Sequence, residues 1–248
     1  MNRTSEYSFT IVVPVFNEED NMARLEETLS DFIPRSLFTA CVLFVNDGST
    51  DRSLDEIKAV CSRHEEFFYI SFAKNAGLSA ALKAGFELVE SEYVGYMDAD
   101  LQTAPEDFNL LLEEIRTCPM AIGIRAGRKD SFFKKFQSAV ANGFRRMVTH
   151  DGALDTGCPL KVLRSDVAKR IPLFDGMHRF LPALVLLQDG GSFRQIPVRH
   201  FPRTQGKSKY HLWNRLVGPF IDCFGYLWMK SRWLSYRIED ENIGSKDI

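Results

Sequence analysis

The sequence predicts a doubly wound α/β domain with a mostly parallel sheet, and three observations support this prediction. The chain has 248 residues, of which 45% are hydrophobic and 26% charged, as in a globular protein and unlike a disordered or fibrous one. Short apolar runs rich in β-branched residues alternate with amphipathic segments. The links between them are short, as in parallel strands joined by helices.

Each element of the first half follows from its own pattern. The apolar runs are continuous, which is typical of strands buried on both faces; they cover residues 9–15, 40–45, 67–72, 93–97 and 120–124. The intervening segments repeat apolar residues every three or four positions, several with acids or proline at the start. These predicted helices cover residues 18–32, 51–63, 78–89 and 105–116.

The second half has a different pattern. We expect a basic amphipathic helix, an antiparallel strand with a turn, an apolar helix and an edge strand, over residues 131–148, 153–162, 180–188 and 192–201. Residues 211–233 are aromatic-rich and amphipathic, and Gly218 with Pro219 is expected to break them into two helices. The apolar face of this segment is expected to lie in a membrane interface; packing on the α/β domain or on another subunit is the alternative.

Charge is distributed unevenly along the chain. Residues 1–124 hold nine Lys or Arg and 22 Asp or Glu, whereas residues 125–248 hold 22 and 11. An acidic half followed by a basic half suggests a metal-binding or base-binding half and an anion-binding half. No nucleic-acid motif is present, so nucleic acid is not an expected partner.

The location of the protein is predicted from cysteines and from apolar runs. Five cysteines without CxxC spacing are expected to be free thiols in a reducing compartment, with no structural zinc. We see no signal peptide and no apolar run of about 18 residues that would span a bilayer. The expected location is therefore cytoplasmic.

Polar motifs follow three of the predicted strands. Asp98 and Asp100, with Gln102, leave the strand 93–97, and their oxygens suit Mg²⁺ or Mn²⁺. Paired acids at such a position are also common as helix-start charges. Asp47 and Gly48 follow the second strand, where a turn or a base-binding carboxylate is expected. Since ligands of such sheets bind outside the carboxyl ends of the strands, these motifs should share one edge.

Four motifs in this order resemble glycosyltransferase family 2. They are Pro14-Val-Phe-Asn17-Glu18, Val45-Asn-Asp47-Gly48-Ser49-Thr-Asp51, Asn75-Ala-Gly77-Leu with Ala80 and Gly85, and Asp98-Ala-Asp100-Leu-Gln102. Three further motifs resemble the polyprenyl-phosphate sugar transferases of that family, the dolichol-phosphate mannosyltransferase and bactoprenol glucosyltransferase type. They are Gly123-Ile-Arg125, Asp155-Thr-Gly157-Cys-Pro-Leu-Lys161 with Arg164, and Arg203-Thr-Gln-Gly206-Lys-Ser208-Lys209-Tyr210. The resemblance covers about residues 9–210.

The resemblance implies a GT-A-type fold and transfer of a sugar, with inversion, from a nucleotide-diphosphate sugar. It implies that the nucleotide-sugar is bound by Pro14, Asn17, Glu18, Asp47, Ser49, Asn75, Gly77 and Asp98. It implies that Asp98, Asp100 and Gln102 hold Mg²⁺ or Mn²⁺. The implied residues around the acceptor phosphate are Arg125, Lys134, Ser138, Asp155, Arg203 and Lys209. Of all these, Asp98, Asp100, Arg125 and Arg203 are the predicted catalytic residues.

Three departures from the family pattern bear on these roles. Asn46 stands where many members have a second Asp, and Pro159 stands where Gly or Phe is common. Many relatives also continue into transmembrane helices, whereas this sequence ends at Ile248. The predicted organisation is a catalytic domain, interface helices and a polar tail, over residues 1–210, 211–237 and 238–248. Within the catalytic domain, residues 1–124 form the nucleotide half and 125–210 the acceptor half.

The expected function is sugar transfer to a polyprenyl phosphate by a protein peripheral to the inner face of the membrane. A phosphate acceptor is already anionic and needs no general base. The first alternative is transfer to a glycan hydroxyl, which would need a carboxylate base, for which Asp155 is the candidate. The second is a noncatalytic nucleotide-sugar-binding adaptor. A separate integral membrane protein and a second copy of the chain are left open as partners. His178 is interpreted as a capping or packing residue rather than a catalyst.

Overall fold

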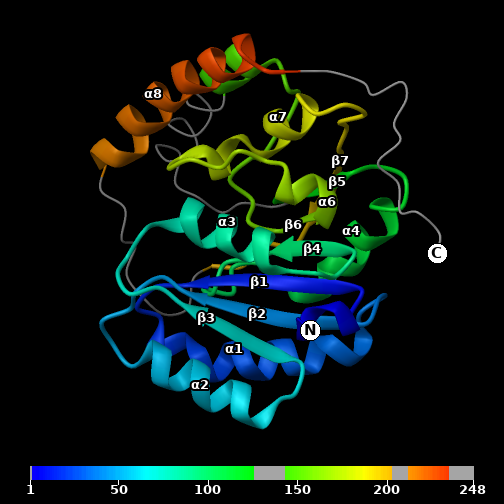
Figure 1. Ribbon diagram of the computed structural model, residues 1–248, viewed down its shortest axis with the longest axis vertical. Coiled ribbons are helices and arrows are strands. Elements are labelled where there is room, and N and C mark those ends of the chain that lie inside the picture. Colours follow the sequence, from blue (N-terminus) through cyan, green and yellow to red (C-terminus); the bar gives the residue numbers. More distant parts are fainter. Residues whose placement is uncertain (1, 126–142, 203–211, 235–248) are drawn as a thin grey trace, which may run out of the picture.

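A seven-stranded sheet forms the centre of the computed structural model, which describes residues 2–125, 143–202 and 212–234 (Figure 1). The strands are β1 (Phe9–Val15), β2 (Ala40–Asn46), β3 (Phe67–Ser71), β4 (Tyr93–Tyr96), β5 (Met120–Arg125), β6 (Lys161–Arg164) and β7 (Arg194–Val198). Their order across the sheet is β3-β2-β1-β4-β6-β5-β7. Strand β6 runs antiparallel to both of its neighbours, whereas the other pairings within the described sheet are parallel. The mixed, mostly parallel α/β fold is confirmed.

Helices cover both faces of the sheet, and Figure 1 shows the resulting three layers. The α-helices are α1 (Glu19–Phe32), α2 (Ser53–Arg63), α3 (Leu78–Leu88), α4 (Phe108–Glu114), α6 (Ser165–Lys169), α7 (Leu181–Leu186) and α8 (Leu212–Ser231). Short 3₁₀ turns are η1 (Arg3–Glu6), η2 (Ile33–Arg35), η3 (Pro105–Asp107) and η4 (Met177–Phe180). Residues 143–149 are also helical.

Two apolar clusters fill the spaces between the layers. The first joins one sheet face to α1, α2 and α4, and the second joins the other face to α3, α6, α7 and α8. Strands β1 and β2 are buried almost throughout, which explains their continuous apolar sequences. Gly85 lets α3 approach β1, because a Cβ at this position would lie 2.6 Å from Cγ1 of Val12.

Two predictions for the second half need correction. The expected antiparallel strand is present as β6, but it begins only at Lys161. Residues 153–160 form no strand, and the turn before β6 is held by side-chain contacts instead of a ladder. Helix α8 continues through Gly218 and Pro219. A proline inside a helix removes one hydrogen bond and crowds the preceding turn, but the C-terminal part of α8 is fixed by its packing on the second cluster. Of the predicted basic helix 131–148, residues 143–148 are described and are helical.

Helix α8 has one buried and one exposed side. Cys223, Tyr226 and Met229 are buried in the second cluster, and the ring of Tyr226 stacks on Phe180 with centroids 5.8 Å apart. The exposed side carries large apolar residues; they are Phe220, Ile221, Phe224, Leu227 and Trp228. One side of the helix therefore shows the alternative arrangement, packing on the α/β domain, while an exposed apolar surface remains on its other side. Within the described residues, no helix combines the length and the hydrophobicity that crossing a bilayer demands.

Candidate active site

An acidic loop follows β4 at the carboxyl edge of the sheet. Asp98 is half-buried and Asp100 is buried. The Asp100 carboxylate accepts a hydrogen bond from the backbone N–H of Gln102, at 3.1 Å. Leu101, between them, has φ 52°, a left-handed conformation that costs energy in a residue with a branched side chain. Strain of this kind is often concentrated at functional sites.

The donor set of this loop fits a hard divalent cation. Burial and the adjacent charge of Asp100 raise the pKa of Asp98 to about 6, and a bound cation would favour both ionised carboxylates. Carboxylate and amide oxygens are the ligands that Mg²⁺ and Mn²⁺ prefer. The described residues contain no cluster of three or more His, Cys, Asp or Glu side chains suited to a metal. A cation here would therefore depend on Asp98, Asp100 and Gln102, completed by water or by a ligand.

The turns after β1 and β2 are joined by hydrogen bonds between motif residues. The backbone N–H of Asn17 donates to Oγ of Ser49 at 3.0 Å, and Oδ1 of Asn17 accepts from the N–H of Thr50 at 2.7 Å. The N–H of Glu18 donates to Oγ of Ser53 at 2.8 Å. The same residues that were predicted to bind nucleotide thus fix the relative position of two strand-to-helix turns.

Asp47 is buried, and both of its carboxylate oxygens hold the loop that precedes α3. Oδ1 accepts from the N–H of Ala76 at 2.6 Å, and Oδ2 accepts from the N–H of Gly77 at 2.9 Å and from Nδ2 of Asn75 at 2.8 Å. These contacts give Asp47 a structural role at the start of α3. Its predicted contact with the nucleotide stays a prediction.

A pocket of about 440 Å³ opens beside these turns, at the carboxyl ends of β2 and β3. It is lined by Phe16, Asn46, Gly48, Ser49, Thr50, Leu54, Ser71, Phe72, Ala73, Lys74 and Asn75. Aromatic walls with amide, hydroxyl and ammonium groups suit a heterocyclic base carrying a charged group. Ser49 and Asn75 were predicted to bind nucleotide, whereas Phe16, within the first motif, and Lys74, directly before the third, were not singled out.

Asn46 has a clear structural role where many family members carry an acid. Its amide donates to Oγ of Ser71 at 2.8 Å, and its carbonyl oxygen accepts from the N–H of Ser49 at 3.3 Å. An amide can do both, whereas a carboxylate has no proton to donate. The residue therefore connects β2, β3 and the following turn.

Arg125, at the end of β5, forms a bidentate ion pair with Asp155. Nε and Nη2 of Arg125 lie 2.8 and 2.7 Å from the two carboxylate oxygens, and its backbone N–H adds a contact of 3.2 Å. Gly157 leaves room for this guanidinium, because a Cβ there would lie 2.9 Å from Nη2. The two predicted acceptor residues are thus brought together.

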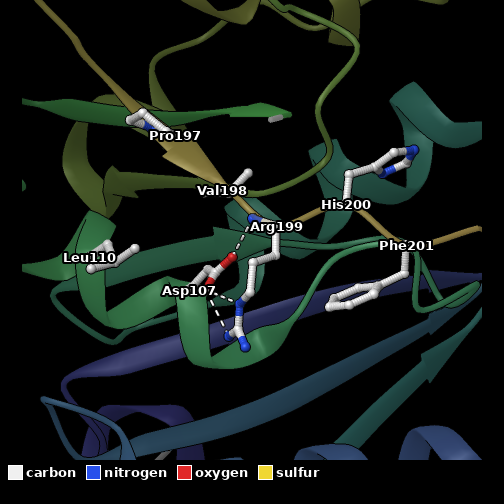
Figure 2. Close-up of a pocket in the computed structure, with 7 residues that line it drawn as sticks. All are labelled: Asp107, Leu110, Pro197, Val198, Arg199, His200 and Phe201. Atoms are coloured by element: carbon white, nitrogen blue, oxygen red, sulfur yellow. Dashed lines mark hydrogen bonds and ion pairs between the residues drawn. The ribbon is translucent and has the colours of Figure 1, made fainter. Parts of the chain in front are cut away.

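A second pocket, of about 520 Å³, lies beside the tail of β7 and is shown in Figure 2. Backbone N–H and Nε of Arg199 contact the Asp107 carboxylate at 2.7 and 2.8 Å. The next residues reach the acidic loop, since the carbonyl of Gln102 accepts from the N–H of Phe201 at 2.8 Å and lies 3.1 Å from Nδ1 of His200. The Arg199–Asp107 pair therefore anchors the chain beside the acidic loop, a role that the sequence did not reveal.

His178 is bonded to the first turn of α3, as expected for a capping or packing residue. Its Nδ1 lies 2.8 Å from Oγ of Ser79. Burial, with smaller effects from Arg179 and Lys161, lowers its pKa to about 3. The ring is therefore neutral near pH 7.

Lys134, Ser138, Arg203 and Lys209 lie outside the described residues. Their predicted convergence with Arg125 on one anionic pocket stays a prediction. The described chain does reach Pro202, immediately before the basic motif, beside the acidic loop.

Known proteins with similar sequences support the resemblance. The family model described as glycosyl transferase family 2 matches residues 10–171. A dodecaprenyl-phosphate galacturonate synthase of Rhizobium johnstonii is 32% identical over 206 residues, which are 81% of this chain and 61% of that protein. An undecaprenyl-phosphate 4-deoxy-4-formamido-L-arabinose transferase of Edwardsiella ictaluri is 32% identical over 217 residues, 82% of this chain and 63% of the relative. The chain thus spans about three-fifths of the length of these relatives.

Solved structures share the fold. Glucosyl-3-phosphoglycerate synthase of Mycobacterium tuberculosis, solved with Mn²⁺ and UDP, aligns with a TM-score of 0.68 at 13% identity, covering 94% of this chain and 84% of the other. A mannosyltransferase of Pyrobaculum calidifontis, solved with GDP-mannose and Mn²⁺, aligns with a TM-score of 0.62 at 17% identity, covering 89% and 64%. The expected GT-A-type fold is confirmed. Because the family model matches well over half of the sequence, the chain belongs to glycosyl transferase family 2.

Proposed function

We propose that this protein transfers a sugar from a nucleoside-diphosphate sugar to a polyprenyl phosphate at a membrane surface. In this reaction a phosphate oxygen of the acceptor attacks the anomeric carbon. The bond from that carbon to the diphosphate breaks, its electrons leave with the nucleoside diphosphate, and the configuration inverts. The names of both relatives support a polyprenyl-phosphate acceptor.

The observation that carries the proposal is the Arg125–Asp155 ion pair. A hydroxyl acceptor needs a base, and Asp155 was the candidate for that task. Its oxygens are engaged by two charged hydrogen bonds of 2.7 and 2.8 Å, which would have to be broken or weakened before it could take a proton. A phosphate acceptor carries its own negative charge near neutral pH, so it needs orientation rather than deprotonation.

The donor is assigned to the carboxyl edge of the sheet. The pocket between Phe16 and Lys74 is suited to the base, and the acidic loop is suited to the cation at the diphosphate. Mg²⁺ or Mn²⁺ held by Asp98, Asp100 and Gln102 would stabilise negative charge on the leaving group. The structural neighbours that bind UDP or GDP-mannose together with Mn²⁺ support this assignment.

The exposed side of α8 is assigned to the membrane interface. Trp228 is 66% exposed, Ile221 61% and Phe224 54%, and large apolar groups at this density suit the boundary between headgroups and acyl chains. This assignment gives the protein a peripheral position next to the polyprenyl phosphate, and we propose the inner face of the membrane as its location.

The decisive experiment is a transfer assay with short polyprenyl phosphate, the matching polyprenol without phosphate, and a panel of UDP- and GDP-sugars. We expect a lipid-linked sugar from the phosphate acceptor and none from the polyprenol. Excess EDTA and the variant Asp100→Ala should both reduce turnover by several orders of magnitude. Transfer to polyprenol, or full turnover in EDTA, would reject the corresponding part of the proposal.

Asp155 separates this function from transfer to a hydroxyl group. If Asp155 positions Arg125, then Asp155→Asn retains the shape of the side chain and should leave measurable transfer with a raised KM for the acceptor. If Asp155 is a general base, the same variant should lose nearly all turnover at every acceptor concentration.

A further inference from the structure

Lys161 is a lysine buried within the sheet, close to the acidic loop. Only 1% of its surface is exposed. It is the first residue of β6 and lies directly opposite Tyr96, the last residue of β4, in the antiparallel pairing. Because residues paired across neighbouring strands project from the same face, its ammonium group lies 5.2 Å from the centroid of the Tyr96 ring.

The ammonium group holds the turn that precedes β6. It donates a hydrogen bond to the carbonyl of Cys158 and another, at 3.3 Å, to the carbonyl of Thr156. The same turn carries Asp155, which is paired with Arg125, and Gly157, which lies against the guanidinium. The turn is therefore held by two residues: Arg125 binds the side chain of Asp155, and Lys161 binds the backbone carbonyls of Thr156 and Cys158.

The same lysine also contacts the support of the acidic loop. The side chain of Tyr96 is hydrogen-bonded to Asp98, and the Tyr96 ring is the one that Lys161 approaches. The Lys161 ammonium group thus contacts Tyr96, which is bonded to Asp98, and also the backbone of the turn that carries Asp155. A methionine of similar length would fill the space without the cost of burying a charge, so packing alone does not account for a lysine here.

We propose that Lys161 is a positioning residue that holds the turn 155–158, and with it the Arg125–Asp155 pair, in register with Asp98 during sugar transfer. The inference rests on the proposed function, since it names the acceptor side of that same site. Displacement of a substrate-orienting group by about 1 Å commonly costs about 100-fold in rate. Loss of Lys161 should therefore lower turnover without removing any group that touches the donor.

The test compares Lys161→Met and Lys161→Gln with the wild-type protein and with Leu163→Ala. Leu163 is fully buried on the same strand, and its truncation loosens the core without removing a hydrogen-bond donor. We expect Lys161→Met to fold and to lower kcat for polyprenyl phosphate about 100-fold, with the KM for the donor within twofold of wild type. Lys161→Gln keeps an amide NH₂ group that can donate to the turn, so its kcat should fall only about tenfold.

Amide hydrogen exchange supplies a readout that does not require turnover. In Lys161→Met, exchange at residues 156–158 should accelerate at least tenfold, while exchange in α3 stays unchanged. Unaltered exchange, or turnover within threefold of wild type, would overturn the proposal. So would an equal loss of turnover in Leu163→Ala, or failure of both Lys161 variants to fold, since either would make the lysine a general stabilising residue. If the wild-type protein transfers nothing to polyprenyl phosphate, the proposed function fails, while the exchange data still decide whether Lys161 holds the turn.

Discussion

Replacing Asp47 by Asn should destabilise the protein even without any ligand. In the wild type, the two carboxylate oxygens accept from two backbone N–H groups and one side-chain amide, at 2.6 to 2.9 Å. In Asp47→Asn one oxygen becomes an NH₂ group, so either Ala76 or Gly77 loses its acceptor. An unsatisfied buried donor costs about 1–3 kcal/mol, and the remaining bonds lose their charge. We therefore expect the free energy of unfolding to fall by about 2–4 kcal/mol.

Urea unfolding of the ligand-free protein measures this loss, and Asp55→Asn is the matched control. Asp55 is exposed in the first turn of α2, so neutralising it should cost at most the helix-dipole contribution, less than about 1 kcal/mol. Affinity for a nucleoside diphosphate with Mg²⁺ should fall as well, because Asn75 lines the pocket. Wild-type stability combined with weaker nucleotide binding would refute the structural role and favour a direct contact between Asp47 and the base.

Three further predictions follow from single contacts. Gly157→Ala should fold normally but displace the Arg125 guanidinium, raising the acceptor KM at least tenfold in steady-state kinetics; unchanged kinetics would contradict the tight fit. Burial lowers the pKa of His178 to about 3, so its protonation in the unfolded state should reduce stability as the pH falls from about 6.5 toward 3. Urea titrations at several pH values give the slope of the unfolding free energy against pH. In His178→Gln this slope should lack the histidine contribution, up to about 1.4 kcal/mol per pH unit; equal slopes in the two proteins would exclude that contribution. Phe224→Glu with Trp228→Glu should abolish flotation with anionic liposomes while preserving the melting temperature, and undiminished flotation would count against membrane contact by α8.

The first half of the fold follows closely from the sequence because each strand there is buried on both faces. The run 9–15 was predicted with the bounds that β1 has, since a continuous β-branched run ending at polar residues has few other solutions. The position of β6 between β4 and β5 was not predictable in this way. Strand β6 has only four residues, and their sequence does not determine which strands they pair with. Helix α8 was predicted to break at Pro219 from local propensity, which tertiary packing overrides.

The site was predictable where its residues follow strands directly. Asp98 and Asp100 were identified because they leave β4, whereas Arg125 was identified only through the family motif Gly123-Ile-Arg125. Arg199 was not identified, since its partner Asp107 lies 92 residues earlier and neither belongs to a motif. Lys161 was noted only as part of a motif, because its burial depends on the strand opposite it.

The insertion of β6 also constrains how the chain reaches its native state. Strands β4 and β5 do not touch each other in the ladder; each pairs with β6, which is made 65 residues after Tyr96. During synthesis, β1 to β4 can assemble with only local crossovers, but the edge of β4 stays open until Arg164 has left the ribosome. An unpaired edge of this kind invites pairing with other chains. Fragments that end shortly before residue 161 should therefore aggregate. Fragments extended through α6, which contain β6, should be much more soluble.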